Sequence, residues 1–107
     1  MQIAVLGAGM VGRAIAIDLA KDFDVTSFDL NPANLLELHK RNKAIKTLTV
    51  NLNQYEQFEQ WLAPYDLVVT AVPGFNGYQT LEAVIRAGKN VVDISFFPED
   101  ALQLDKL

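Results

Sequence analysis

Three glycines near the start of the chain have the type and spacing that can hold a phosphate group. Gly7, Gly9 and Gly12 follow a short apolar run, residues 2–6, and lead into a segment with helical periodicity. In this pattern the first glycine permits a tight turn, the second lets a pyrophosphate approach the backbone, and the third lets the helix pack on the strand. The N–H groups and positive dipole end of that helix would face the phosphates. The sequence therefore predicts a dinucleotide site, rather than a ligand-free strand–turn–helix connection, at Gly7, Ala8, Gly9, Met10, Val11 and Gly12.

An acidic side chain, Asp29, closes the second apolar run, about twenty residues after the glycines. A carboxylate at this point can accept both ribose hydroxyls of the adenosine half of a dinucleotide, whereas a 2′-phosphate would meet a like charge. The next residues, Leu30, Asn31 and Pro32, offer no arginine to neutralise that phosphate. Asp29 and Leu30 are therefore assigned to the adenosine side of a site that prefers NAD(H) to NADP(H), with a plain strand-end role as the alternative for Asp29. Arg13 could also approach a phosphate, or be a solvated helix residue.

Small and polar residues at the other expected strand ends complete the candidate site. Asn51 follows the third strand, where a side-chain amide can meet an adenine edge or simply form a turn. The wall beside the nicotinamide ribose is assigned to the small residues that close the central strand, Ala71, Val72 and Pro73. Pro73 could equally do no more than end that strand. Asp93 and Ser95 end the fifth strand and are either polar groups near a substrate or caps of the last helical segment.

The elements that must position these residues alternate between strand and helix along the whole chain. We expect strands at residues 2–6, 24–29, 44–50, 66–72 and 90–94. Helices are expected after the glycine turn, at 32–41, 54–62 and 76–87, and in a last segment at 99–107. Right-handed crossovers would join them into a doubly wound parallel sheet, a Rossmann fold, in strand order 3-2-1-4-5 with helices on both faces. The ligand crevice would then lie beyond the carboxyl ends of the first and fourth strands.

Helix ends and helix faces carry their own signals. Asn31 is expected to cap the second helix, with Pro32 as its first residue, and Gly88 to end the fourth. The buried face of the first helix is expected at the apolar residues with helical spacing, Val11, Ile15, Leu19 and Phe23. On the fourth helix, Tyr78, Leu81 and Ile85 are expected to lie on one face.

Composition sets limits on the chemistry. The 107 residues suit one domain, and half of them are apolar. A formal net charge of −4 without a basic cluster argues against a nucleic-acid partner. The absence of cysteine and the presence of a single histidine, His39, argue against disulfides, thiolate metal sites and a serine–histidine triad. No stretch reaches the roughly 20 apolar residues of a membrane span, so a cytoplasmic protein is the default expectation.

Two segments, together with the glycine turn, resemble one enzyme family. Residues 66–78 read Asp-Leu-Val-Val-Thr-Ala-Val-Pro-Gly-Phe-Asn-Gly-Tyr. Residues 87–100 read Ala-Gly-Lys-Asn-Val-Val-Asp-Ile-Ser-Phe-Phe-Pro-Glu-Asp. The chain is similar over essentially its whole length to the N-terminal cofactor domain of the saccharopine dehydrogenase family, in particular its lysine 6-dehydrogenase-like branch.

This resemblance implies an NAD(P)-dependent amino-acid dehydrogenase that oxidises or forms an amine on lysine, saccharopine or a polyamine-like substrate. It places the glycines at the pyrophosphate, Asp29 at the adenosine ribose and residues 71–74 beside the nicotinamide. Asp93 and Ser95 would lie near the junction with a substrate domain. Since members of the family continue into that domain, we expect this chain alone to bind cofactor without turnover. No acid–base pair, nucleophile or metal cluster is evident in the sequence.

Two further expectations concern partners. If the fifth strand is an unprotected sheet edge, it invites pairing between chains, so a homo-oligomer is expected, with Phe96 and Phe97 as possible contacts. The alternative function is a non-catalytic NAD(H)-sensing domain that regulates a potassium transport system. Such domains also combine the glycine turn with an acid at the end of the second strand, but the segment Val-Asp-Ile-Ser-Phe-Phe does not suit them.

Overall fold

The chain folds around a five-stranded parallel sheet in the order β3-β2-β1-β4-β5, which confirms the expected Rossmann topology. A computed structural model describes residues 1–72 and 76–94. The strands are β1 (Gln2–Leu6), β2 (Asp24–Asp29), β3 (Lys46–Thr49), β4 (Leu67–Thr70) and β5 (Val91–Asp93). The last three are shorter than expected, and the helical segment expected at 99–107 lies outside the described residues.

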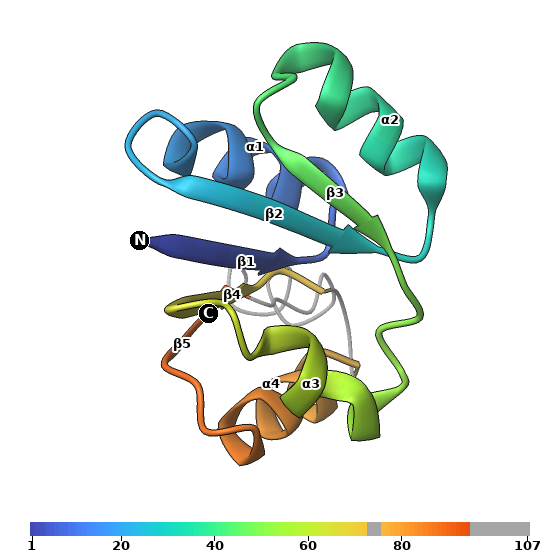
Figure 1. Cartoon of the computed structure of the whole chain (residues 1–107). Coiled ribbons are helices and arrows are strands. Elements are labelled where there is room, and N and C mark those ends of the chain that lie inside the picture. Colours follow the sequence, from blue (N-terminus) through green and yellow to red (C-terminus); the bar gives the residue numbers. More distant parts are fainter. Residues whose placement is uncertain (73–75, 95–107) are drawn as a thin grey trace, which may run out of the picture.

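Helices cover both faces of the sheet (Figure 1). They are α1 (Met10–Leu19), α2 (Pro32–Arg41), α3 (Phe58–Leu62) and α4 (Asn76–Arg86), with a 3₁₀ turn, η1 (Tyr55–Gln57), leading into α3. One core cluster joins the strands to α1 and α2 through residues such as Ala16 and Leu38. A second joins the opposite face of the sheet to α3 and α4 through Phe58, Leu62 and Val84. This two-sided burial explains why the central strands are nearly continuous apolar runs.

The helix ends follow the expected local chemistry. The Asn31 side chain accepts a hydrogen bond from the N–H of Ala33 at 2.9 Å, and Pro32 is the first residue of α2. Gly88 has a φ of +76°, a left-handed conformation that stops the chain from continuing α4. Asn31 and Pro32 thus start α2 at the carboxyl edge of the sheet, whereas Gly88 ends α4 before the chain enters β5 at the opposite edge.

The expected buried face of α1 is wrong in part. Val11 and Phe23 are each 39% exposed, and Phe23 lies beyond the end of the helix. The residues of α1 that are fully buried are Gly12 and Ala16, with Ile15 and Leu19 only partly covered. The reason is the close approach of α1 to the strands, which favours small residues along the contact line over the neighbouring row of large ones.

The apolar face of α4 formed by Tyr78, Leu81 and Ile85 is only partly covered. Tyr78 is 70% exposed and Ile85 is 58% exposed, while Thr80 and Val84 are buried. These two rows are adjacent on the helix surface, so periodicity alone separates them poorly. Val84 packs in the core cluster on this face of the sheet, whereas in the larger apolar row only Leu81 is half-buried.

Candidate cofactor-binding site

The glycine turn lies between β1 and α1, and two of its glycines are required by the packing of the protein itself. Gly7 has a φ of +104°, and a Cβ on it would lie 2.6 Å from the carbonyl oxygen of Ala71. A Cβ on Gly12 would overlap the carbonyl oxygen of Gly7. Larger residues at either position would therefore force the turn away from the strands β1 and β4.

Gly9 differs from the other two glycines of the turn. Its φ of −68° and ψ of −168° are extended backbone that other residues adopt. Apart from Gly9 and its two chain neighbours, no residue that the structure describes has an atom within 4 Å of the position where a Cβ on Gly9 would be. Neither the backbone angles nor the described neighbouring atoms require a glycine at position 9. The absence of a side chain there is consistent with a ligand that approaches the backbone closely.

The start of α1 presents backbone donors beside this open position. The N–H of Arg13 donates to the carbonyl oxygen of Gly9 at 2.8 Å. This is the first hydrogen bond of α1 between a residue and the one four positions before it. The N–H groups of Met10, Val11 and Gly12 precede it and, as in any α-helix, have no intrahelical acceptor. Because Met10 is 81% exposed, this helix end is open to solvent. It therefore has the donors and the dipole orientation that bind a pyrophosphate.

Asp29 lies at the end of β2 and holds the glycine turn. Its Oδ2 accepts a hydrogen bond from the N–H of Ala8 at 2.6 Å, and its Oδ1 accepts one from the N–H of Asn31 at 2.8 Å. A carboxylate has about four acceptor positions, so both oxygens can accept further bonds. The half-buried side chain can thus fix the turn and still receive ribose hydroxyls.

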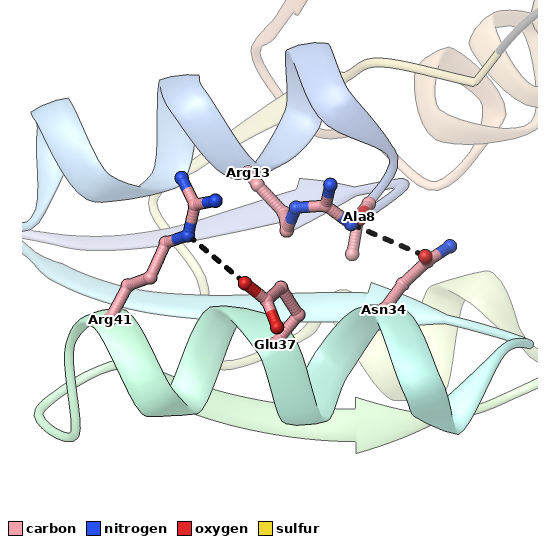
Figure 2. A network of polar contacts seen from close by, with 5 residues as sticks. All are labelled: Ala8, Arg13, Asn34, Glu37 and Arg41. Carbon is pink, nitrogen blue, oxygen red and sulfur yellow. Dashed lines mark hydrogen bonds and ion pairs between the residues drawn. The ribbon is translucent and has the colours of Figure 1, made fainter.

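Arg13 is not a fully solvated helix residue. Its side chain is half-buried, and its Nη1 donates to the carbonyl oxygen of Ala8 and to the Oδ1 of Asn34, each at 3.3 Å. Figure 2 shows the side chain running from α1 toward α2 and ending between these two acceptors. Sequence reasoning missed Asn34 entirely. The sequence does contain one signal for it: Asn34 is a polar amide residue in the first turn of α2, next to the buried Leu35 and one helical turn before the buried Leu38.

The carboxyl ends of the strands meet at one edge of the sheet. Leu6 pairs in register with Phe28 on one side and with Thr70 on the other, and Thr70 pairs with Asp93. The residues that directly follow β1, β2 and β4 therefore emerge side by side. This edge brings together the glycine turn, Asp29 and Ala71, as the strand order predicts.

Other candidates at this edge have identifiable local roles. Ala71 donates its N–H to the carbonyl oxygen of Leu6 at 2.8 Å, and Val72 is buried. Asn51 is exposed, and its Oδ1 accepts from the N–H of Asn53 at 2.9 Å, which is a turn-forming bond. Leu30 is 60% exposed.

On β5, Asp93 accepts a hydrogen bond through its Oδ1 from the Thr70 hydroxyl at 2.6 Å. Asp93 is exposed, while Thr70 is fully buried. The candidates Pro73 and Ser95 lie outside the described residues. A hydroxyl from β4 thus orients the Asp93 carboxylate on β5.

The described residues also form a groove that does not include the glycine turn. The groove, of about 470 Å³, is lined by residues of η1, α3 and α4 together with Ala87. No group of three or more histidine, cysteine or acidic side chains is arranged to hold a metal ion in residues 1–72 and 76–94. Within the same ranges, no helix has both the length and the apolar character needed to cross a membrane.

The fold and the glycine turn define a nicotinamide-dinucleotide-binding Rossmann domain. The family model described as the saccharopine dehydrogenase NADP binding domain matches residues 3–106, so the chain belongs to that family. No curated protein sequence matches the chain.

Solved structures show the same architecture. The chain is similar to saccharopine dehydrogenase (L-Glu forming) from Saccharomyces cerevisiae, with 25% identity and a TM-score of 0.74 over 89% of this chain. It spans only 22% of that enzyme.

Two nucleotide-bound structures are similar in fold alone. The enzyme WbmG of Bordetella bronchiseptica in complex with NAD is 12% identical, with a TM-score of 0.67 over 87% of this chain and 36% of WbmG. A short-chain dehydrogenase/reductase of Veillonella parvula in complex with NADP is 16% identical, with a TM-score of 0.64 over 86% of this chain and 46% of its own.

Proposed function

We propose that the chain binds NAD(H) in preference to NADP(H), as the cofactor half of an amino-acid dehydrogenase. The observation that carries the proposal is Gly9, whose missing side chain is explained by neither its backbone angles nor the described atoms around it. A pyrophosphate above Gly9 would meet the free N–H groups at the start of α1. Membership of the saccharopine dehydrogenase family supports the binding of a nicotinamide dinucleotide, without favouring NAD(H) over NADP(H).

The preference for NAD(H) is argued from Asp29. Its carboxylate is fixed by two backbone donors, so it cannot turn away from a ribose without breaking those bonds. The 2′- and 3′-hydroxyls of NAD can donate to it, whereas the 2′-phosphate of NADP would be repelled. A phosphate here would need a cation, and the nearby Arg13 donates to Ala8 and Asn34 instead.

The substrate would be an amino acid whose CH–NH or CH–NH₂ group exchanges a hydride with the nicotinamide, which is the chemistry the bound cofactor supplies. We place Ala71, Val72 and Pro73 beside the nicotinamide ribose, with Asp93 and Ser95 on the substrate side. A lysine- or saccharopine-like substrate follows from the resemblance to the lysine 6-dehydrogenase-like branch. Since the chain spans 22% of the yeast enzyme, we expect these 107 residues to bind cofactor without turnover.

Calorimetric titration of the chain with NADH and with NADPH tests this function. We expect tighter binding of NADH, and in Asp29→Ala we expect that preference to disappear. The matched control is Asp66→Ala, because Asp66 also accepts a backbone N–H, that of Gln2 at 2.8 Å, but precedes β4 at the opposite edge of the sheet. Asp66→Ala should keep the preference for NADH. Absence of binding by either dinucleotide would contradict the proposed function.

A further inference from the structure

We propose that Asn34 sets the cofactor preference by holding the Arg13 guanidinium away from the place where a ribose 2′-phosphate would lie. Asn34 is thus a positioning residue that acts through Arg13. The inference rests on the proposed function, since it concerns how the same dinucleotide site discriminates between NAD(H) and NADP(H).

The first step of the argument is the proximity of Arg13 to the adenosine side of the site. Ala8 is held at both of its backbone polar groups, its N–H by the Asp29 carboxylate and its carbonyl oxygen by the Arg13 guanidinium. The acid assigned to the ribose hydroxyls and the cation that could bind a phosphate are therefore linked through a single residue. In the part of the chain that the structure describes, Arg13 and Asp29 form no ion pair with each other.

The second step concerns the donors of Arg13. A guanidinium has about five N–H donors in a rigid fork, an arrangement that suits phosphate oxygens. Only Nη1 is engaged in the described contacts, with Ala8 and Asn34. The remaining N–H groups, on Nε and Nη2, are the ones that could bind a phosphate if the side chain turned toward the ribose.

The third step is that Asn34 is the residue of α2 that holds this side chain. Glu37, about one helical turn further along α2, is paired instead with Arg41 at 3.4 Å. Figure 2 shows the two pairs side by side between α1 and α2, the Arg13–Asn34 pair nearer the glycine turn. Asn34 is itself fixed in the first turn of α2, where its N–H bonds to the carbonyl oxygen of Asn31 at 3.1 Å.

The fourth step is that the hydrogen bonds from Arg13 to Ala8 and Asn34 are weak enough for the guanidinium to leave them. Both bonds from Nη1 measure 3.3 Å, beyond the usual range of about 2.7–3.2 Å for N–H···O bonds. Loss of the Asn34 amide would leave the guanidinium held by the Ala8 carbonyl alone. A dianionic phosphate nearby would then compete favourably for it, because the planar guanidinium can bind two phosphate oxygens at once and an anion attracts it more strongly than a neutral carbonyl oxygen does.

The test is a set of titrations of the 107-residue chain with NADH and with NADPH, comparing Asn34→Ala, Arg13→Ala and the double variant. In Asn34→Ala we expect the affinity for NADPH relative to NADH to rise about tenfold, the effect of one additional charge-assisted bond. In Arg13→Ala/Asn34→Ala that gain should vanish, since there is no guanidinium to release. Asn34→Asp keeps the acceptor oxygen and should retain the preference for NADH.

Two results would overturn the inference. If Arg13→Ala alone weakens NADPH binding selectively, the guanidinium already reaches the phosphate and Asn34 does not restrain it. If Asn34→Ala leaves the ratio of the two affinities unchanged, Asn34 is merely structural. Circular dichroism of each variant verifies that it is folded. If Asn34→Ala unfolds, Asn34→Leu replaces it, because leucine removes the acceptor and keeps a side chain of similar size. Failure of the unsubstituted chain to bind either dinucleotide would instead refute the proposed function.

Discussion

The Asp29 carboxylate accepts a hydrogen bond from the backbone N–H of Ala8 at 2.6 Å, which joins the end of β2 directly to the glycine turn. The same carboxylate accepts the N–H of Asn31 at 2.8 Å, at the start of α2. One side chain thus fixes the relative positions of the two segments assigned to the pyrophosphate and to the adenosine ribose. Its removal should affect both the stability of the turn and the affinity for a dinucleotide.

The first prediction separates these two effects of Asp29. In Asp29→Asn the side chain keeps its shape but only one acceptor oxygen, so one of its two bonds from backbone N–H groups is lost and the other loses its charge assistance. We expect the free energy of unfolding to fall by about 1–2 kcal/mol. NADH affinity should fall as well, because an amide nitrogen cannot accept from a ribose hydroxyl. Urea denaturation and calorimetric titration measure the two quantities. An Asp29→Asn variant that bound NADH as tightly as the unsubstituted chain would contradict the assigned role of the carboxylate.

The second prediction compares two glycines of the same turn. Gly9→Ala should change the free energy of unfolding by no more than about 1 kcal/mol, since its backbone angles suit alanine and the added Cβ meets no described atom. It should nevertheless weaken dinucleotide binding by roughly tenfold or more, because the Cβ would occupy the space proposed for the pyrophosphate.

Gly12→Ala is the matched comparison. Its Cβ would overlap the Gly7 carbonyl oxygen, so this variant should lose about 3 kcal/mol or more of stability, or fail to fold. Thermal unfolding and NADH titration of the two variants provide the measurement. Equal stability losses at the two positions would show that Gly9 is structural and would remove the main support for a ligand there.

The sheet order and the helix ends were predictable because local signals determine them. Asn31 and Pro32 mark the start of α2 whatever the rest of the chain does, and alternating strands and helices leave few allowed topologies. The faces of α1 and α4 were not predictable, because large apolar residues such as Val11 and Tyr78 lie beside the small ones that make the closest contacts. Which of the two rows is buried depends on how near each helix comes to the sheet.

The candidate site also has a part that the sequence predicts and a part that it does not. The glycines and Asp29 follow strand ends, so the topology alone brings them to one edge. The contact between Arg13 and Asn34 joins residues 21 positions apart on two different helices. It depends on the distance and rotation of α1 relative to α2, and no spacing rule in the sequence encodes these two quantities.

The third prediction concerns the hydroxyl of Thr70, which donates to the Asp93 carboxylate at 2.6 Å from a fully buried position. Thr70→Val keeps the shape of the side chain and removes the donor. We expect a loss of about 1–3 kcal/mol in the free energy of unfolding, as for other hydrogen bonds to charged groups. Thr70→Ser retains the hydroxyl and should lose less of that energy. Chemical denaturation monitored through Trp61 fluorescence measures both variants, and a valine variant more stable than the serine variant would contradict the importance of this bond.

The last prediction concerns Ser27, whose buried hydroxyl lacks a hydrogen-bond partner among the described residues, unlike that of Thr70. Ser27 lies in the middle of β2, is 0% exposed, and its Oγ has no hydrogen-bond partner among the described residues. Burial of an unpaired hydroxyl costs free energy, because the group loses its bonds to water without replacing them. Ser27→Ala should therefore leave stability unchanged or raise it by up to about 1 kcal/mol, in contrast to the loss expected in Thr70→Val. Denaturation of both variants under the same conditions makes the comparison, and a loss of stability in Ser27→Ala as large as that in Thr70→Val would mean that the Ser27 hydroxyl does have a partner in solution.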